Sequence, residues 1–458
     1  MDESIMTGES MPVDKTAGSN VMSGTINQFG TFVMRATKVG KDSSVNRLIA
    51  LVERADASKV EIVRLADRWA TWVVVAALFS AAATWFVTGE IVRAVTILVV
   101  FCPCALVLAT PTAVMAAIGN ATRHGFLVRA GDALERLSAV GKAVFDKTGT
   151  LTKGKPVLGE VCVKEGFDGN EVLRLAAGVE ASSEHPLGKA IVEGYKLRAD
   201  SKRIASVEHF KMIPGKGVEG IVDGKTIAVG TRQFVCGKNQ ESEGCALYEA
   251  AKTQAGQGKT VSFVSIDGNL AGFLTLQDSI RPLAGKVVSS LRSLGLVPVL
   301  LTGDHKDAAQ RVAKTIGITS VSAQCLPETK LQFIGNEQHQ GQKVVMIGDG
   351  VNDAPALKSA HVGIAVAGAG NNIAMESADI VMVGERIEEI PHLVRLSRKM
   401  MRVIRINLAM AMGINFAAVV LAMGGWMGPV VGALVHNAGS VLVILHSASL
   451  LKFRTKKL

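Results

Sequence analysis

The feature that most constrains this chain is a set of four uncharged apolar runs, each long enough to cross a membrane. A helix of about 20 apolar residues spans the ~30 Å hydrocarbon core of a bilayer. One such run could be a buried core helix, but four of them favour a transmembrane bundle. The connection between the first two runs, at residues 88–90, is so short that the two runs must form an antiparallel pair. The runs lie at about residues 69–87, 94–118, 406–426 and 429–451.

Composition and charge agree with a membrane protein that carries soluble domains. Of the 458 residues, 48% are hydrophobic and only 20% are charged, whereas soluble domains have about 25% charged residues. Much of the formal net charge of +10 sits beside the apolar runs, as at the cytoplasmic ends of membrane spans. No basic stripe interleaved with aromatic residues occurs, so we expect no nucleic-acid partner. The six cysteines form no disulfide framework. We expect an integral protein of the plasma (inner) membrane, in contact with lipid, with cytoplasmic soluble domains.

The stretch between the two pairs of runs is soluble in character. Short β-branched runs followed by Gly and Asp occur at residues 143–145, 297–301 and 344–347, with helical patterns between them. This alternation predicts a doubly wound α/β domain. From residue 157 to residue 275 the pattern changes to hairpins and helices, with a turn signal at residues 222–225. We therefore expect a second domain inserted into the first.

The first 45 residues are rich in Gly, Thr and Val. They contain no basic segment followed by an apolar core, so no signal peptide is predicted. The alternating run over residues 31–36 predicts a small β structure.

The strongest chemical signal is the string DKTGTLT at residues 146–152, directly after a predicted strand. An aspartate at the carboxyl end of a parallel strand lies where such sheets bind ligands. There the Asp146 carboxylate can attack a phosphoryl group and form an aspartyl phosphate. Gly149 and the threonines leave backbone and hydroxyl groups to hold phosphate oxygens. A lone DKTG could equally be a β-turn, but the full string is far more specific.

Two further strand ends carry residues suited to phosphoryl transfer. The string GDGVNDAP at residues 348–355 places Asp349 and Asp353 four positions apart, which suits Mg²⁺. Thr302 ends another strand and can hold a phosphate oxygen, and Lys330 can neutralise phosphoryl charge. Either of the last two could be a surface residue. Together, the three clusters provide a nucleophile, a metal site and charge stabilisation.

A different chemistry is indicated inside the second apolar run by Cys102-Pro103-Cys104. A proline there frees a backbone carbonyl and kinks the helix, which opens a site between spans. Two flanking thiols are soft ligands for Cu(I), Zn²⁺ and similar ions. The alternative is two small buried residues, because free cysteine packs well in apolar surroundings.

Taken together, the strings at 146–152, 302–304 and 348–355 resemble the phosphorylation-domain signatures of P-type ATPases, which have a haloacid-dehalogenase-like core. Cys-Pro-Cys is the hallmark of the heavy-metal subfamily. The resemblance covers essentially the whole chain. It implies ATP as substrate, Mg²⁺ as cofactor and an aspartyl-phosphate intermediate. It implies four Mg²⁺ ligands, which are Asp146, Thr148, Asp349 and Asp353. It also implies that Asp146, Lys330 and Thr302 are catalytic.

Other family marks extend the resemblance to the nucleotide and the water. SEHPL at residues 183–187 resembles the nucleotide-domain signature, whose histidine, here His185, contacts adenine or phosphate. The resemblance adds Glu180, Gly215 and Gly217 to that nucleotide site. TGES at residues 7–10 resembles the actuator loop, in which Glu9 would direct water onto the aspartyl phosphate. Residues 278–282 match the hinge that returns the chain to the phosphorylation domain.

The transported ion is less well defined by the last two runs. The copper(I) type has Tyr-Asn where this chain has Ile414-Asn415, and a methionine where it has His436. The lysine and aspartate of the zinc/cadmium type are absent, and the histidine of the cobalt-like type is kept but its glutamate is lost. We expect Cys102, Cys104, Asn415, His436 and Ser440 to bind the ion. A divalent ion such as Zn²⁺, Cd²⁺ or Co²⁺ is favoured, and Cu(I) export is the alternative.

The expected fold is thus a multidomain membrane protein: a helical transmembrane bundle, an α/β phosphorylation domain, an inserted α+β nucleotide-binding domain and a partial β-rich actuator domain. We expect the amino-terminal part of the family to be lacking. The alternatives to a metal transporter are a transport-incompetent membrane fragment and a soluble-type phosphatase with the same core. If the protein is a transporter, we expect a metallochaperone among its partners. The expected division is residues 1–45 for the actuator part, 46–122 for a linker helix and the first span pair, 123–156 with 276–400 for the phosphorylation domain, 157–275 for the nucleotide-binding domain, and 401–458 for the second span pair.

Overall fold

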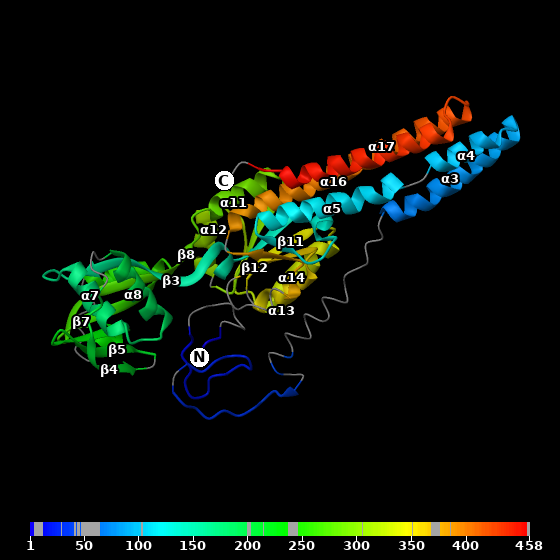
Figure 1. Cartoon of the computed structure of the whole chain (residues 1–458). Coiled ribbons are helices and arrows are strands. Elements are labelled where there is room, and N and C mark those ends of the chain that lie inside the picture. The colour runs from blue at the N-terminus through cyan, green and yellow to red at the C-terminus, as the bar shows by residue number, and fades with distance from the viewer. Residues whose placement is uncertain are drawn as a thin grey trace.

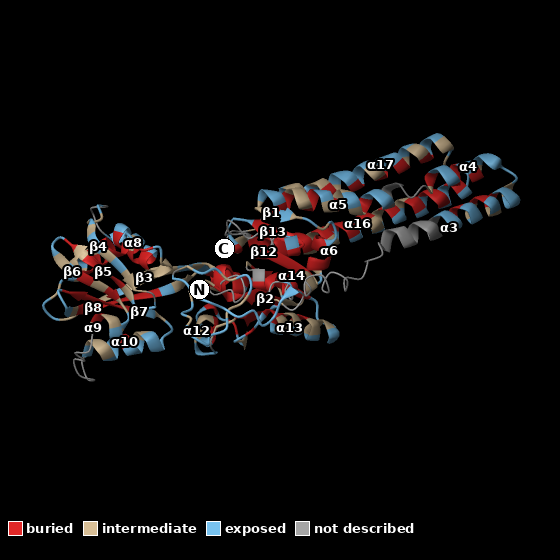
Figure 2. Ribbon diagram, turned by 90° about the horizontal axis from the view of Figure 1, so that it is seen from below, coloured by how far each residue is buried: buried red, intermediate tan, exposed pale blue. Residues whose placement is uncertain are grey.

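The computed structural model shows a central α/β body with a bundle of long helices on one side and a second soluble body on the other (Figure 1). The two soluble bodies are built around separate sheets, and each has a buried interior (Figure 2). The structure describes residues 1–3, 12–28, 30–40, 43, 46, 65–101, 104–198, 203–213, 215–236, 246–304, 306–349, 351–367, 376–384 and 386–455.

The bundle described in the structure consists of five helices packed side by side. Helices α5, α16 and α17 contact one another, and α3 pairs with α4 across the short connection at Gly89. Within the described residues, two helical stretches are long and apolar enough to cross a membrane, Ile387–Met423 and Pro429–Lys452, with shorter apolar stretches at Val74–Thr88 and Ile91–Val100. The bounds are α3 Leu65–Thr88, α4 Ile91–Val100, α5 Cys104–Arg123, α16 Ile390–Met423 and α17 Pro429–Ala448, followed by the 3-10 turn η5 Ser449–Lys452.

Two predicted spans have different limits in the structure. The run at 94–118 is not one helix, because α4 ends at Val100 and α5 begins at Cys104. Pro103, to which the sequence assigns a kink, lies outside the described residues. Helix α16 begins at Ile390, well before the predicted 406. Its first turns pack into the core of the α/β body, where Leu393 and Leu396 are fully buried.

The α/β body has a seven-stranded sheet in the order β1-β13-β12-β11-β2-β9-β10. All neighbouring strands are parallel except the edge pair β1 and β13. The strands predicted at 143–145, 297–301 and 344–347 are confirmed as three adjacent central strands. The strand bounds are β1 Phe126–Val128, β2 Lys142–Asp146, β9 Val297–Leu301, β10 Ser320–Ser322, β11 Val344–Gly348, β12 Val362–Ala367 and β13 Ile380–Val383.

Helices cover both faces of this sheet and complete two apolar layers. One layer contains Phe145 and Ile347, and the other contains Val144 and Met346, because successive strand residues point to opposite faces. The helices are α6 Ala133–Ser138, α11 Ala284–Ser293, α12 Lys306–Ile316, α13 Pro327–His339 and α14 Ala354–Ser359, with one-turn segments η2 Lys147–Leu151, η3 Val351–Asp353 and η4 Ile387–Glu389.

The second body is an insertion that leaves and returns through two paired strands. Strands β3 and β8 run antiparallel from the Thr152–Ile280 pair into a six-stranded sheet, ordered β3-β8-β7-β6-β5-β4. The predicted turn is confirmed, because Asp223 and Gly224 have positive φ angles between β5 and β6. The bounds are β3 Thr152–Val163, α7 Gly169–Glu180, α8 Pro186–Arg198, β4 Val207–Ile213, β5 Gly217–Val222, β6 Lys225–Gly230, α9 Arg232–Cys236, α10 Ala246–Gly256, β7 Thr260–Ile266 and β8 Asn269–Ile280.

The described amino-terminal residues contain little regular structure. Asp2 and Ile26 form an isolated antiparallel bridge, and the Met1 amino group donates to the Val13 carbonyl at 3.0 Å. The strand predicted over 31–36 is wrong for this structure, since these residues are exposed and no strand is assigned to them. An alternating pattern forms a strand only where another strand pairs with its backbone.

Candidate functional site

The carboxyl ends of three adjacent strands bring the predicted phosphoryl-transfer residues together. Strand β2 lies between β11 and β9, and all three are parallel. Asp146 is the last residue of β2, Thr302 follows β9, and Asp349 follows β11. Because the strands are in register, with Asp146 opposite Leu301 and Phe145 opposite Ile347, these residues meet at one edge of the sheet.

Lys330 joins this cluster from the first turns of α13. Its Nζ lies 2.6 Å from Asp146 Oδ1 and 2.7 Å from Asp353 Oδ1. The lysine is 1% exposed, and both carboxylates are also buried. Burial lowers the pKa of the Lys330 ammonium, but the two carboxylates act more strongly, so its pKa lies well above the usual value. The ammonium therefore stays charged and ties the nucleophile candidate to Asp353.

Asp146, Asp349 and Asp353 form a compact carboxylate cluster. Each can offer an oxygen such that the three oxygens lie within 4.8 Å of one another. Burial, followed by the charges of Asp146 and Asp353, raises the pKa of Asp349 to about 8. Clustered carboxylate oxygens are the donors that Mg²⁺ prefers, so the residues present suit that cofactor.

The loop after Asp146 is shaped by a glycine. Gly149 has φ +70°, and a Cβ on it would lie 1.4 Å from Asp349 Oδ2. Only a residue without a side chain lets this loop approach the carboxylate. Thr148, the other predicted Mg²⁺ ligand, is buried in the same loop.

Sequence reasoning missed two cationic residues that hold this site. Arg281 is buried just after β8, and its guanidinium donates to the carbonyls of Gly149 and Thr150, both at 2.9 Å. In the sequence, residues 278–282 match only a hinge between domains. The arginine within this segment is the signal that could have indicated a cation beside the site. Lys147, inside the DKTGTLT string, places Nζ 2.6 Å from Asp304 Oδ2. Thr302 is 1% exposed, and its Oγ1 accepts from the Asp304 backbone N–H at 3.2 Å.

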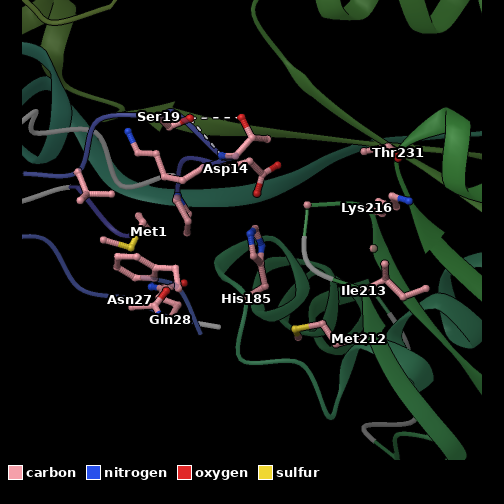
Figure 3. Close-up of a pocket in the computed structure, with 18 of the residues that line it drawn as sticks. Met1, Asp14, Ser19, Asn27, Gln28, His185, Met212, Ile213, Lys216 and Thr231 are labelled. Atoms are coloured by element: carbon pink, nitrogen blue, oxygen red, sulfur yellow. Dashed lines mark hydrogen bonds between the residues drawn. The ribbon is translucent and has the colours of Figure 1, made fainter. Parts of the chain in front are cut away.

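The predicted nucleotide residues line one cavity of about 1130 Å³ between the inserted body and the amino-terminal segment, where His185 faces Asp14 (Figure 3). Glu180 is at the end of α7 and His185 precedes α8. Gly217 begins β5, and Gly215 lies two residues before it. Residues 12–28 supply part of the opposite wall, including Asp14. The cavity is large enough for a nucleotide, because ligand pockets are typically about 300–1,000 Å³.

Two of the titratable groups that line this cavity, Glu180 and His185, are displaced toward their neutral forms. Burial raises the pKa of Glu180 to about 7, against the effect of the Ser183 hydroxyl. Burial also lowers the pKa of His185, although Asp14 acts in the opposite direction. A Cβ on Gly188 would lie 2.3 Å from Glu180 Oε2, so α8 packs closely onto the carboxyl.

The remaining predicted residues are in the bundle or the amino-terminal segment. Cys102 and Glu9 lie outside the described residues, and Cys104 begins α5 without a described side chain. Asn415 and His436 are each 9% exposed, on α16 and α17. The Ser440 hydroxyl donates to the His436 carbonyl at 3.2 Å. His436 Nδ1 is buried and has no hydrogen-bond partner among the described residues.

Comparison with known proteins identifies the family. Residues 143–361 match the haloacid dehalogenase-like hydrolases, and residues 1–53 match the P-type ATPase actuator domain. The fold superposes on a zinc-transporting PIB-type ATPase in its E2.Pi state, with a TM-score of 0.84 and 31% identity over 98% of this chain and 74% of that one. The chain belongs to the heavy-metal P-type ATPase family.

Curated relatives of this ATPase carry different ion names. A copper-exporting P-type ATPase of Bacillus subtilis is 38% identical over 99% of this chain, and a cadmium-transporting ATPase of Staphylococcus aureus is 34% identical over 100%. The chain spans 57% and 64% of the length of these two relatives. The predicted P-type ATPase fold is thus confirmed, with its haloacid-dehalogenase-like, nucleotide-binding and actuator parts.

Proposed function

We propose that this protein is an ATP-driven transporter that exports a transition-metal ion through an aspartyl phosphate at Asp146. The observation that carries the proposal is the contact of Lys330 with both Asp146 and Asp353, beside Asp349. A buried nucleophile, a fixed cation and a carboxylate cluster at one sheet edge are what phosphoryl transfer requires. The division of the chain into domains that we expect from the sequence is part of this proposal.

The phosphorylation step uses the residues of this sheet edge. A carboxylate oxygen of Asp146 attacks the γ-phosphorus of ATP, and the bond to the bridging oxygen breaks, so that ADP leaves. The Lys330 ammonium then exchanges its carboxylate partner for a phosphoryl oxygen, and the Thr302 hydroxyl donates to another. Asp146, Thr148, Asp349 and Asp353 would hold Mg²⁺, which neutralises charge on the phosphate oxygens when bound.

Hydrolysis returns the site to its starting state. Water attacks the phosphorus, the bond to the Asp146 oxygen breaks, and inorganic phosphate leaves. Glu9 directs this water in our proposal. The ATP base sits in the cavity beside His185 and Glu180, which Gly215 and Gly217 also line.

The ion is held in the bundle by donors from three helices. Thiolates of Cys102 and Cys104, with Asn415, His436 and Ser440, form a mixed sulfur, nitrogen and oxygen site in this proposal. The unpartnered, buried Nδ1 of His436 supports a ligand role, because an unsatisfied polar atom at membrane depth is costly. An imidazole with two thiolates favours a divalent ion such as Zn²⁺, Cd²⁺ or Co²⁺.

Cu(I) is the second candidate ion. The specific observation in its favour is the 38% identity to the copper-exporting relative, together with the retained Asn415. We place the protein in the plasma membrane, with its soluble bodies in the cytoplasm and a metallochaperone as the source of the ion.

The test is ATP hydrolysis by the purified chain in lipid nanodiscs against a panel of Cu(I), Zn²⁺, Cd²⁺, Co²⁺, Ni²⁺ and Mn²⁺. We expect stimulation by at least one divalent ion, and its loss in the Cys102→Ser/Cys104→Ser variant. His436→Ala should weaken stimulation by divalent ions more than stimulation by Cu(I). Stimulation by Cu(I) alone would replace the divalent assignment. A rate of ATP hydrolysis that no ion in the panel changes would contradict metal transport by this chain.

A further inference from the structure

A buried group of hydrogen bonds joins the end of α5, the start of α16 and the turn that follows α17. Asn120 of α5 donates through Nδ2 to the carbonyl oxygens of Leu450 and Phe453, both at 2.8 Å. Its Oδ1 lies 3.0 Å from Nε2 of His392, in the first turn of α16. His392 Nδ1 in turn lies 2.9 Å from Thr455 Oγ1. Asn120 and His392 are each 2% exposed, so these contacts are shielded from water.

The polar atoms of both side chains have partners of the right kind. Nδ2 of Asn120 faces carbonyl oxygens, which only accept, so its amide oxygen is the atom that faces His392. His392 Nε2 must therefore carry the proton, and Nδ1 accepts from the Thr455 hydroxyl. The imidazole also stacks between His124 and Phe453, with ring centroids 3.8 Å and 5.6 Å away. A buried polar network that is satisfied in this way specifies one arrangement of the segments it joins.

The three joined segments differ in how the chain attaches them to the α/β body. Helix α5 leads directly into β1, and the first turns of α16 are part of the body's core. Helix α17 ends beside the body, but the residues described after it form the turn η5 and no strand of the sheet (Figure 1). That turn is held by the burial of Leu450 and by the hydrogen bonds of Asn120 and His392. At this end of the bundle, α17 is therefore attached to the body by non-covalent contacts.

We propose that Asn120 and His392 are positioning residues that couple the phosphorylation state of the α/β body to ion binding by α17. The inference rests on the proposed transport function, in which Cys104, Asn415 and His436 come from α5, α16 and α17. A movement of the α/β body reaches α5 and α16 along the chain, whereas α17 follows only while the turn after it stays bound. Without these hydrogen bonds, His436 no longer moves together with the ligands on the other two helices.

The test measures how binding at one site changes affinity at the other, with the full chain in nanodiscs. Zn²⁺ binding is followed by equilibrium dialysis with and without Mg²⁺ and beryllium fluoride, which stand in for the phosphoryl group on Asp146. If Cu(I) alone stimulates the parent chain, Cu(I) under reducing conditions replaces Zn²⁺. In the parent we expect the fluoride to change the ion dissociation constant by about 5–150-fold, the usual range for coupled sites. By linkage, the ion should change the affinity for the fluoride by the same factor.

Two variants remove the hydrogen bonds and one restores a donor. His392→Phe keeps a flat ring beside His124 but cannot bond to Asn120, and Asn120→Leu removes the amide. Both should bind Zn²⁺ alone and fluoride alone as the parent does, while the coupling factor falls to about one. His392→Gln should recover part of the coupling, because its amide N–H can donate to Asn120 Oδ1. A loss of packing alone would change the separate affinities and would not be relieved by glutamine.

Ser397→Ala is the matched control. Ser397 is also fully buried on α16, but its hydroxyl donates to the Leu393 carbonyl of the same helix at 3.0 Å and joins no second segment. This variant should keep the parent's coupling factor. Full coupling in His392→Phe and Asn120→Leu, or an equal loss in Ser397→Ala, would overturn the proposal.

Hydrogen exchange of the unmutated chain provides a measurement in case a variant fails to fold. Zn²⁺ and the fluoride should each change the exchange of the backbone N–H groups at residues 449–455. The hairpin turn at residues 222–225 in the inserted body is the control for Zn²⁺ and should not respond. Unchanged exchange at 449–455 in a parent whose phosphorylation responds to the ion would overturn the proposal. Failure of the transport function itself would appear differently, as absence of metal-stimulated phosphorylation in the parent chain.

Discussion

Lys330 and Asp146, which are 184 positions apart in the sequence, are joined by a 2.6 Å contact between Nζ and Oδ1 in a fully buried setting. The same ammonium contacts Asp353 at 2.7 Å. One cation therefore faces three carboxylates, since Asp349 belongs to the same cluster. The three carboxylates outweigh the single ammonium, and in our proposal this excess of negative charge binds Mg²⁺.

The first prediction concerns the covalent intermediate. Asp146→Asn should abolish acid-stable labelling from γ-labelled ATP, because an amide cannot form the acyl phosphate. The matched control is Asp223→Asn, at an exposed turn with a positive φ angle that asparagine tolerates. Labelling should persist in the control. Labelling of the Asp146→Asn variant at the parent level would show that another residue is phosphorylated.

The second prediction concerns the buried cation. Lys330→Met leaves Asp146 and Asp353 facing each other without compensation, and loss of one partner of a buried ion pair costs about 3–5 kcal/mol. We expect a lower thermal unfolding temperature for the nanodisc-embedded chain and no phosphorylation. Adding Asp353→Asn should recover much of the stability but none of the phosphorylation. Recovery of both would mean that Lys330 has only a structural role.

The third prediction concerns the loop after the nucleophile. Gly149→Ala should abolish phosphorylation, because its Cβ would overlap Asp349 Oδ2 at 1.4 Å. Gly268→Ala is the control, since Gly268 has a similar φ of +76° but open space around it. The control should lose only about 1–2 kcal/mol of unfolding free energy, from the left-handed backbone, and keep its phosphorylation. Equal effects of the two changes would point to backbone strain instead of the contact.

The fourth prediction is a pH dependence that arises from Glu180. Its pKa rises from 4.5 to about 7 on folding, so the folded chain keeps a proton that the unfolded chain releases. The resulting stability is fully present below pH 4.5 and is lost as the pH rises to about 7. Glu180→Gln should remove this dependence, a difference of up to about 3 kcal/mol above pH 7. Urea unfolding of both chains across this range measures it, and parallel curves would contradict the assignment.

Much of the phosphoryl-transfer site could be predicted because a parallel sheet leaves little choice. Once Asp146, Thr302 and Asp349 were placed at the ends of buried strands, their meeting at one edge followed from the fold class. The nucleotide residues depended instead on the family resemblance, since nothing in the spacing of Glu180 and His185 required a cavity. The prediction of a strand at residues 31–36 failed because alternation of apolar and polar residues does not by itself provide a neighbouring strand to pair with.

The sequence by itself determined the elements that periodicity and strand-end chemistry define: the apolar helices, the three central strands, the inserted domain and the aspartate proposed as the nucleophile. Only the tertiary structure decided which cation faces the proposed nucleophile and that Arg281 holds the Gly149 loop. These relationships join residues more than 130 positions apart through side-chain geometry. Local patterns report which face of an element is apolar, whereas the partner of a buried polar atom is selected by the packing of the whole domain.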